Sequence, residues 1–330
     1  MEHYLLYHET IPPFLAACAA APCMQRLKGV GMNCGCEYTS FPRFANLSPY
    51  SRYDHSLGVA LIVWHFTHDK KQAIAGLLHD VATPVFAHVV DFLNGDYLSQ
   101  ESTEDGTAAI IAQSEALQTI LRDSALSTDD VSDYHRYPIA DNDSPRLSAD
   151  RLEYTLGNCL NYGIRTEEQV RAFYEDLTVT AAEDGQNELA FRTPALACDF
   201  ASAALVCSEI YVSDEDRCAM QMLSELLRFA LSRGVLQRSD LYRDEPTVIS
   251  LLLSDPETAA RWKTYCAYRT VLTAAQPQKQ GEWRRIRAKK RYIDPLISGH
   301  GRVSAYDPAK REAIRAFLAA PQDHWISADD

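Results

Sequence analysis

The stretch AIAGLLHDVATPVFAH occupies residues 73–88. It begins with an apolar run, which is followed by a histidine and an aspartate, two residue types that bind metals. The apolar residues at 73, 74, 77 and 78 repeat with helical spacing and fall on one face. This helix ends in His79 and Asp80, and Pro84 shortly afterwards indicates that it does not continue. An imidazole and a carboxylate at a helix end can both bind one divalent ion. A pair of this kind on its own usually marks only a polar helix end at the surface.

Two further segments place ligand-type side chains at helix ends. Residues 51–60, SRYDHSLGVA, have His55 at the start of an apolar helix, and residues 147–158, LSADRLEYTLGN, have Asp150 opening another. His55, His79, Asp80 and Asp150 offer nitrogen and oxygen ligands that suit Mn, Fe, Ni, Zn or Mg. We therefore predict that these four residues hold a divalent metal ion and leave coordination positions open for water and a phosphate oxygen.

Four motifs follow one another along the chain. They are R-x-x-H-S-L-G at 52–58, G-L-L-H-D at 76–80, P-x-F-A-H at 84–88 and D-R-x-x-Y at 150–154. In this order they resemble the HD superfamily of metal-dependent phosphohydrolases, and within it the branch of deoxynucleoside triphosphate triphosphohydrolases. The resemblance extends from about residue 11 to about residue 230. It implies a small phosphorylated substrate of nucleotide type, hydrolysis by metal-activated water, and a homo-oligomer.

The expected fold is mostly α-helical: an HD-domain helical bundle with a small β-hairpin and a helical C-terminal extension. We expect the HD domain to cover residues 1–235, with its metal-binding core at about 45–160, and the extension to pack on it over residues 236–330. The hairpin is predicted from two alternating strands around Asp184 and Gly185. Thr166 before the hairpin and Ser213 after it are predicted N-caps of helices, and Gly234 is predicted to end the second of these.

Three residues are candidates for binding the substrate on the basis of their positions. Arg52 precedes His55 and could bind a phosphate, or alternatively pair with a neighbouring carboxylate. Tyr154 lies one helical turn after Asp150 on the same face, and Asn158 lies one turn further. The resemblance implies that this face contacts the substrate's sugar and phosphate, whereas a half-buried structural role is the alternative for Tyr154. Asn158 stands where the family usually has an aspartate, which leaves sugar recognition of the usual kind open.

The chain departs from the family pattern at two histidine positions. Thr83 replaces the inner histidine of H-D-x-G-H-x-P-F-S-H, and Thr103 replaces the histidine of a His-Glu-Asp motif. Both family histidines are thought to act on the phosphate near the scissile bond. A threonine hydroxyl can hydrogen-bond a phosphate oxygen, so both threonines remain candidates for substrate binding. It cannot shuttle a proton near neutral pH as an imidazole does.

Three explanations of these replacements remain open. His88, Glu101 or Glu104 could transfer the proton on a different phosphate substrate. Metal-activated water alone could support a slow hydrolysis, or the chain could be a nucleotide-binding sensor or scaffold that has lost the chemistry. For Glu104 the alternative is a first-turn carboxylate that is favourable to the helix dipole.

The composition of the chain argues against several other classes of function. The chain has 330 residues, a formal net charge of −13 and nine cysteines without regular spacing. The acidic balance argues against broad nucleic-acid binding, and scattered cysteines are typical of a reduced, cytoplasmic protein. The N-terminus lacks the pattern of a signal peptide, and no stretch reaches the apolar length of a membrane span.

One basic segment stands out in this acidic chain. Residues 283–292 read WRRIRAKKRY and place six cations within a few residues. These are Arg284, Arg285, Arg287, Lys289, Lys290 and Arg291. Such a run is usually a solvated face. The alternative is a site for an anionic effector or for the tail of the substrate.

Overall fold

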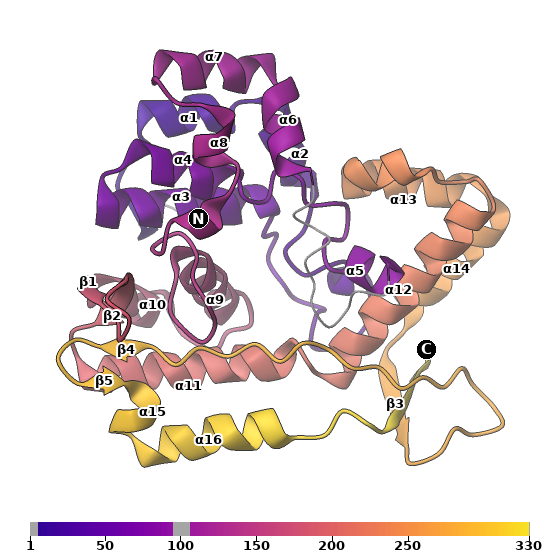
Figure 1. The fold of residues 1–330 in the computed structure, drawn as a ribbon. Coiled ribbons are helices and arrows are strands. Elements are labelled where there is room, and N and C mark those ends of the chain that lie inside the picture. Colours follow the sequence, from indigo (N-terminus) through magenta and orange to yellow (C-terminus); the bar gives the residue numbers. More distant parts are fainter. Residues whose placement is uncertain (1–5, 95–105, 330) are drawn as a thin grey trace.

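The computed structural model describes residues 6–94 and 106–329, and the described chain is mostly helical (Figure 1). The helices of the first half are α1 Pro13–Ala19, α2 Pro22–Arg26, α3 Arg52–Thr67, α4 Lys70–Leu78, α5 Val89–Asn94, α6 Thr107–Gln113, α7 Glu115–Asp123, α8 Thr128–Val131 and α9 Ala149–Asn161. Those of the second half are α10 Glu167–Glu175, α11 Pro194–Ile210, α12 Asp214–Ser232, α13 Glu245–Ser254, α14 Pro256–Ala267, α15 Val303–Tyr306 and α16 Pro308–Ala319. The strands are β1 Leu177–Ala181, β2 Asn187–Phe191, β3 Thr270–Ala274, β4 Leu296–Ile297, β5 Gly301–Arg302 and β6 Trp325–Asp329.

Helices α3 and α4 form a tight antiparallel pair that carries the first metal-binding motifs. The start of α3 is fixed by a capping box, in which the Ser51 hydroxyl accepts from the Asp54 N–H and the Asp54 carboxylate accepts from the Ser51 N–H. His68 ends α3 in the left-handed conformation, with φ of 52°, and Asp69 caps α4 directly afterwards. Because this connection is short, α4 runs back along α3, antiparallel to it.

Gly76 lets the two helices approach closely near the metal-binding end. A Cβ atom on Gly76 would lie 3.3 Å from Val59 and 3.4 Å from Val63, both on α3. This approach brings the C-terminal end of α4 beside the first turn of α3. The sequence therefore places the two segments that contain His55 and His79 next to each other.

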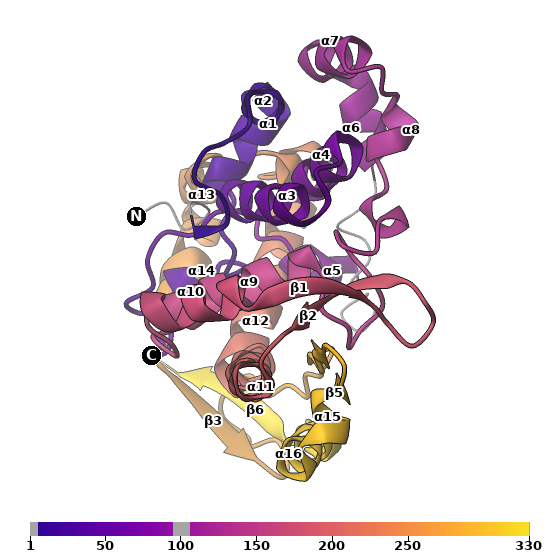
Figure 2. The same cartoon turned by 90° about the vertical axis from the view of Figure 1, so that its left-hand side faces the viewer.

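The predicted hairpin is confirmed, and it belongs to a larger sheet. Strands β1 and β2 pair antiparallel with Leu177 opposite Phe191, and the sheet order is β1-β2-β4-β5 (Figure 2). Strand β4 pairs parallel with β2 through Leu296 and Ile297 alone. The sequence did not indicate this addition because a strand of two residues has no alternation to detect. Thr166 and Ser213 cap α10 and α12 as predicted.

The C-terminal extension, which was predicted to be helical, contains strands as well as helices. Besides α13 to α16 it contains β3 and β6, which pair antiparallel with Thr270 opposite Asp329, and it supplies β4 and β5. Between β3 and β4 the chain runs beside α11 as a long segment without helix (Figure 1). The β-branched residues of β3 favour a strand, but a partner about 55 residues away cannot be assigned from one sequence.

The buried apolar side chains of the described residues include two large clusters. The first joins α3 and α4 to α9, α10 and α11 through buried residues such as Leu61, Leu77 and Phe200. The second joins residues 34–44 and 85–92 to α12, α13 and α14 through Phe86, Leu223 and others. The second core contains residues from both sides of the predicted domain boundary at 235. The division into two domains stays a prediction.

Within the residues that the structure describes, no single helix is both long and apolar enough to cross a membrane. Helices α11 and α12, which are bent by 44° relative to each other, reach that length and composition only as a pair.

A buried pair of carboxyl groups lies at the edge of the second core. Glu245, the first residue of α13, accepts hydrogen bonds from the Tyr38 hydroxyl at 2.7 Å and from the Gly31 N–H at 2.8 Å. Glu37 adjoins it, and burial together with the Glu245 charge raises the pKa of Glu37 to about 8. Neutral Glu37 is therefore the form that the folded protein favours near neutral pH.

Replacing Glu37 with Gln is expected to remove a pH-dependent loss of stability. The folded-state pKa of Glu37 lies above the ordinary value of 4.5, so the folded protein holds this proton more tightly than the unfolded chain does. The stability that this proton contributes is therefore fully present below about pH 4.5 and is lost as the pH rises through about 8. Thermal unfolding should therefore show Glu37→Gln to be more stable than wild type at pH 9, by up to about 5 kcal/mol, and nearly equal to it at pH 4. Equal curves at both pH values would contradict the assignment.

Candidate metal centre

Three helix ends bring the predicted metal ligands into one buried place. His55 lies in the first turn of α3 and is 1% exposed. His79 is the C-cap of α4, and Asp80 follows it. Asp150 lies in the first turn of α9, which Ser148 caps by accepting from the Arg151 N–H. The residues that begin or end each helix therefore fix the backbone positions of the four predicted ligands.

The ligand atoms are separated by distances that suit one shared ion. One nitrogen or oxygen atom from each of His55, His79 and Asp80 lies within 4.8 Å of the other two. The Asp150 Oδ1 atom is 3.0 Å from His55 Nε2 and 3.7 Å from His79 Nε2. The Asp80 Oδ2 atom is 3.5 Å from His79 Nε2 and 3.9 Å from His55 Nε2. Atoms bound about 2.1 Å from one ion lie about 3 to 4 Å from one another, so the set fits a divalent metal.

The second nitrogen of each histidine is held by an acceptor, which leaves Nε2 for the metal. His79 Nδ1 donates to the Gly76 carbonyl oxygen at 2.7 Å. His55 Nδ1 donates to Glu153 Oε2 at 2.5 Å, and Glu153 is fully buried. Hydrogen bonds of this kind fix the ring orientation and the tautomer of metal-binding histidines. Both imidazoles therefore present Nε2 to the two aspartates.

The electrostatics of the centre favour a cation between the carboxylates. Burial lowers the pKa of His55, but Glu153 and Asp150 outweigh it and raise this pKa to about 10. Burial works against ionisation of Asp80, yet Arg52 and the two histidines hold its pKa well below the ordinary value. The pKa of Asp150 is lowered for the same reason by His55 and His79. Without positive charge, these buried carboxylates would be expensive to ionise.

Glu153 is the residue that sequence reasoning missed most clearly. It lies three residues after Asp150, and its Oε2 atom also accepts from the Tyr50 hydroxyl at 2.5 Å. A Cβ atom on Gly58 would lie only 2.6 Å from the Glu153 side chain, and one on Gly157 only 2.6 Å from Tyr50. The two glycines therefore make the space that this buried carboxylate and tyrosine occupy. The spacing of Asp150 and Glu153 on one helix face was an available signal.

Arg52 and Thr83 both contact Asp80. The Arg52 Nη1 atom is 3.1 Å from Asp80 Oδ2, and the Thr83 hydroxyl donates to Asp80 Oδ1 at 2.6 Å. Arg52 thus forms an ion pair with a neighbouring carboxylate, which was the alternative to binding a phosphate, and it also lines the pocket. Thr83 is 2% exposed and uses its hydroxyl hydrogen within the protein. Both side chains orient the Asp80 carboxylate, and their predicted contacts with substrate stay predictions.

His88 lies in the same pocket and is oriented by a second buried acid. Its Nδ1 atom donates to Asp91 Oδ2 at 2.8 Å, and Asp91 is fully buried. Burial lowers the pKa of His88 below its ordinary value, although the hydrogen bond to Asp91 opposes this. His88 is therefore neutral near pH 7, with Nε2 as its proton-accepting atom.

Tyr154 and Asn158 line the pocket from α9, as the helical spacing predicted. Burial raises the pKa of Tyr154 to about 12, so it keeps its proton. The Asn158 amide donates to the Tyr211 hydroxyl at 2.7 Å, and the Asn158 carbonyl oxygen has no hydrogen-bond partner among the described residues. Tyr211 comes from the end of α11, and no local pattern in the sequence linked it to this site.

The pocket joins these residues in one cavity of about 670 Å³. This volume lies within the usual range of about 300 to 1,000 Å³ for small-molecule sites. The cavity is lined by the four predicted metal ligands, by Arg52 and His88, by Tyr154 and Asn158, and by Ala288, Lys289 and Arg291 of the C-terminal extension. Glu101, Thr103 and Glu104 lie outside the described residues.

Comparison with known proteins gives two relatives of limited similarity. No protein-family model matches the chain. The chain is 27% identical over 205 residues to the uncharacterized protein YdhJ of Bacillus subtilis, which covers 61% of each chain. It is 24% identical over 197 residues to a protein of Cordyceps militaris named metal-dependent phosphohydrolase cns2, covering 58% of this chain and 52% of the relative. The matched part is thus between half and two thirds of each relative.

Proposed function

We propose that this protein is an HD-type metal-dependent phosphohydrolase that cleaves a phosphate ester or anhydride of a nucleotide-like compound. The observation that carries the proposal is the convergence of His55, His79, Asp80 and Asp150 at the wall of a cavity. The relative from Cordyceps militaris, by its name, supports the same reaction class. The nucleotide-like substrate rests on the family resemblance, and the implied homo-oligomer stays a prediction.

The residues of the pocket provide the parts that such a reaction needs. A bound divalent ion lowers the pKa of a coordinated water toward about 7 and offsets charge on the phosphoryl group. In this proposal Arg52, which pairs with Asp80, binds a phosphate oxygen. His88, which donates to Asp91, accepts a proton, and the Tyr154 hydroxyl donates a hydrogen bond. Glu101 and Glu104 remain the other predicted proton-transfer groups.

One observation favours a second candidate, a nucleotide-binding sensor without hydrolysis. The Thr83 hydroxyl is engaged with Asp80, and a hydroxyl in this position cannot supply a proton to a leaving group near neutral pH. In a sensor the metal and Arg52 would still hold the phosphate. The two candidates therefore share the binding site and differ in turnover.

A chromatographic hydrolysis screen distinguishes them. The metal-loaded protein is incubated with deoxynucleotides, ribonucleotides, their monophosphates and a generic phosphoester, and each product is identified. We expect turnover of at least one nucleotide-like substrate, and the products show which bond is cut. Asp80→Ala is run in parallel and should lose nearly all of this turnover. Tight binding of metal and nucleotide without any turnover would instead support the sensor.

A further inference from the structure

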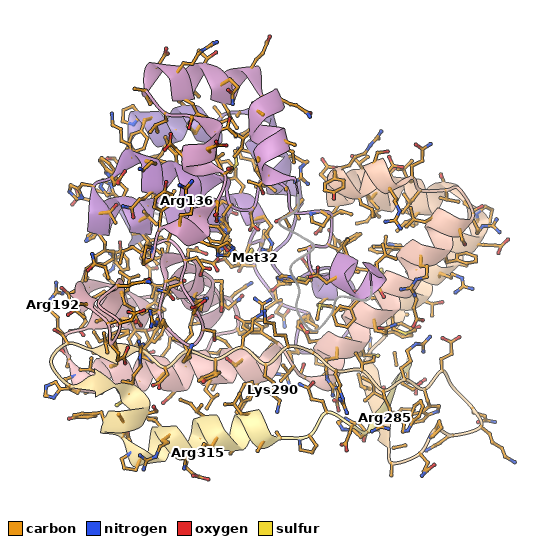
Figure 3. All side chains as sticks on the ribbon, in the orientation of Figure 1. Met32, Arg136, Arg192, Arg285, Lys290 and Arg315 are labelled. Carbon is orange, nitrogen blue, oxygen red and sulfur yellow. The ribbon has the colours of Figure 1, made fainter. Side chains whose placement is uncertain are left out.

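The first turn of α12 places an acidic side chain in the wall of the cavity that holds the predicted metal ligands. Ser213 begins this helix by accepting from the Asp216 N–H at 3.3 Å. Asp216 and Met220 are one helical turn apart, and both line the cavity. Figure 3 shows Met32, which also lines the cavity, near the centre of the view between α9 and α12. The cavity therefore has a carboxyl group on a helix that contributes none of the four predicted metal ligands.

Asp216 is half-buried and has no ion-pair partner among the described residues. Its side chain accepts one weak hydrogen bond there, from the Cys36 thiol to Oδ1 at 3.8 Å. The guanidinium of the adjacent Arg217 donates to Asp214 and to two backbone carbonyls instead. A carboxyl group that is shielded from water and not paired with a cation tends to keep its proton.

The groups around Asp216 act on its proton in both directions. Burial is the largest influence, and together with the Glu215 charge it raises the pKa of Asp216 to about 8. The Cys36 hydrogen bond, Arg217 and Arg43 lower this pKa and do not offset burial. Three other titratable side chains lie near Asp216, and burial raises the pKa of each of them: Cys34, Tyr162 and Tyr265. The Asp216 carboxyl therefore carries a proton near pH 7 that it can release.

The other predicted site residues of the cavity leave the role of proton donor open. Thr83 uses its hydroxyl hydrogen within the protein. His88 is neutral near pH 7 and its Nδ1–H is bound by Asp91, so it accepts a proton more readily than it donates one. Burial raises the pKa of Tyr154 to about 12, which is too high for efficient proton transfer near neutral pH. Asp216 has the acidity that these three side chains lack.

We propose that Asp216 is the general acid of the reaction and protonates the oxygen of the leaving group. As a water attacks phosphorus, the bond from phosphorus to the leaving oxygen breaks and its electron pair goes to that oxygen, which takes the proton of Asp216. The attacking water gives its proton to His88 Nε2. His88 then releases this proton to solvent, and Asp216 takes one up before the next turnover. This inference rests on the proposed function for the reaction and gives α12 a direct part in it.

A comparison of two aryl phosphates tests the acid role. The phenolate that leaves p-nitrophenyl phosphate is a weak base and needs little help from a proton, whereas that of phenyl phosphate is a stronger base. We expect Asp216→Asn to lower kcat for phenyl phosphate about 100- to 10,000-fold and that for p-nitrophenyl phosphate about tenfold or less. Asp216→Glu keeps a carboxyl group and should retain more activity with phenyl phosphate than Asp216→Asn.

The pH dependence of kcat separates Asp216 from Glu37, because burial raises the pKa of both to about 8. A general acid works in its protonated form, so wild-type turnover of phenyl phosphate should fall as the pH rises through about 8. His88 and its partner Asp91 do not cause this fall, because the pKa of His88 is lowered. The fall should be absent in Asp216→Asn and unchanged in Glu37→Gln. Glu37→Gln is the matched control, because Glu37 does not line the cavity.

Infrared spectroscopy detects the proton of Asp216 without turnover. The metal-loaded full chain is measured at about pH 6 and about pH 9, and the carbonyl band of protonated carboxyl groups should weaken at the higher pH. One part of this change should be missing in Asp216→Asn and another part in Glu37→Gln. A band unchanged in Asp216→Asn, or equal losses of kcat for the two phosphates, would overturn this inference alone. A protonated Asp216 in a protein that hydrolyses neither these phosphates nor any nucleotide would contradict the proposed function.

Discussion

Asp80→Ala is expected to lose the bound divalent ion and with it nearly all hydrolytic activity. The Asp80 carboxylate lies 3.5 Å from His79 Nε2 and 3.9 Å from His55 Nε2, so its removal takes one ligand from the set. It also leaves the buried Arg52 and Thr83 without their shared partner. Loss of an outer partner of a metal ligand costs about 10- to 100-fold in affinity or activity, and loss of a ligand should cost more.

Metal analysis of the purified variant and steady-state kinetics measure the effect. Asp143→Ala is the matched control, because Asp143 lines the same cavity, is exposed and lies outside the group of metal ligands. The control should keep its metal and most of its activity. If Asp80→Ala kept a full equivalent of metal, or if both variants lost activity equally, the assignment of Asp80 as a ligand would be wrong.

Glu153→Ala is expected to produce the largest loss of stability, together with weaker metal binding. Glu153 is fully buried and accepts hydrogen bonds from both His55 Nδ1 and the Tyr50 hydroxyl. Removing one partner of a buried charged pair costs about 3–5 kcal/mol, because the remaining polar groups stay buried without partners. His55 would also lose the contact that fixes its ring, which should lower metal affinity about 10- to 100-fold.

Chemical denaturation of the metal-free protein separates the two effects. Glu153→Gln is the control, because it keeps the volume and an acceptor oxygen and removes only the charge. It should lose less stability than Glu153→Ala. A loss below about 1 kcal/mol for Glu153→Ala would show that Glu153 does not support His55 as described.

The sequence indicated which four predicted ligands come together because helix ends carry strong local signals. A capping residue precedes α3, α4 and α9, and each of the four ligands lies within two residues of a helix end or in a first turn. The hairpin was predictable for a similar reason, since alternation and an Asp-Gly turn are encoded within 15 residues.

What the sequence could not show depends on contacts between distant segments. Tyr211 reaches Asn158 across 53 residues, and β4 pairs with β2 across more than 100 residues. The position of Arg291 at the cavity wall is of the same kind, because only the folded chain brings the extension there. Gly58 is an intermediate case. The sequence showed that a glycine stands in the motif, but only the structure shows that its missing side chain makes space for Glu153.

The central claim is that one divalent ion is held by His55, His79, Asp80 and Asp150. A crystal structure of the protein grown with Mn²⁺ tests this claim most directly, with anomalous scattering measured at the manganese edge. The account predicts one strong anomalous peak among the Nε2 atoms of the two histidines and the carboxylates of the two aspartates. A strong peak elsewhere with none at these four residues, or an occupied site that excludes the histidines, would contradict it.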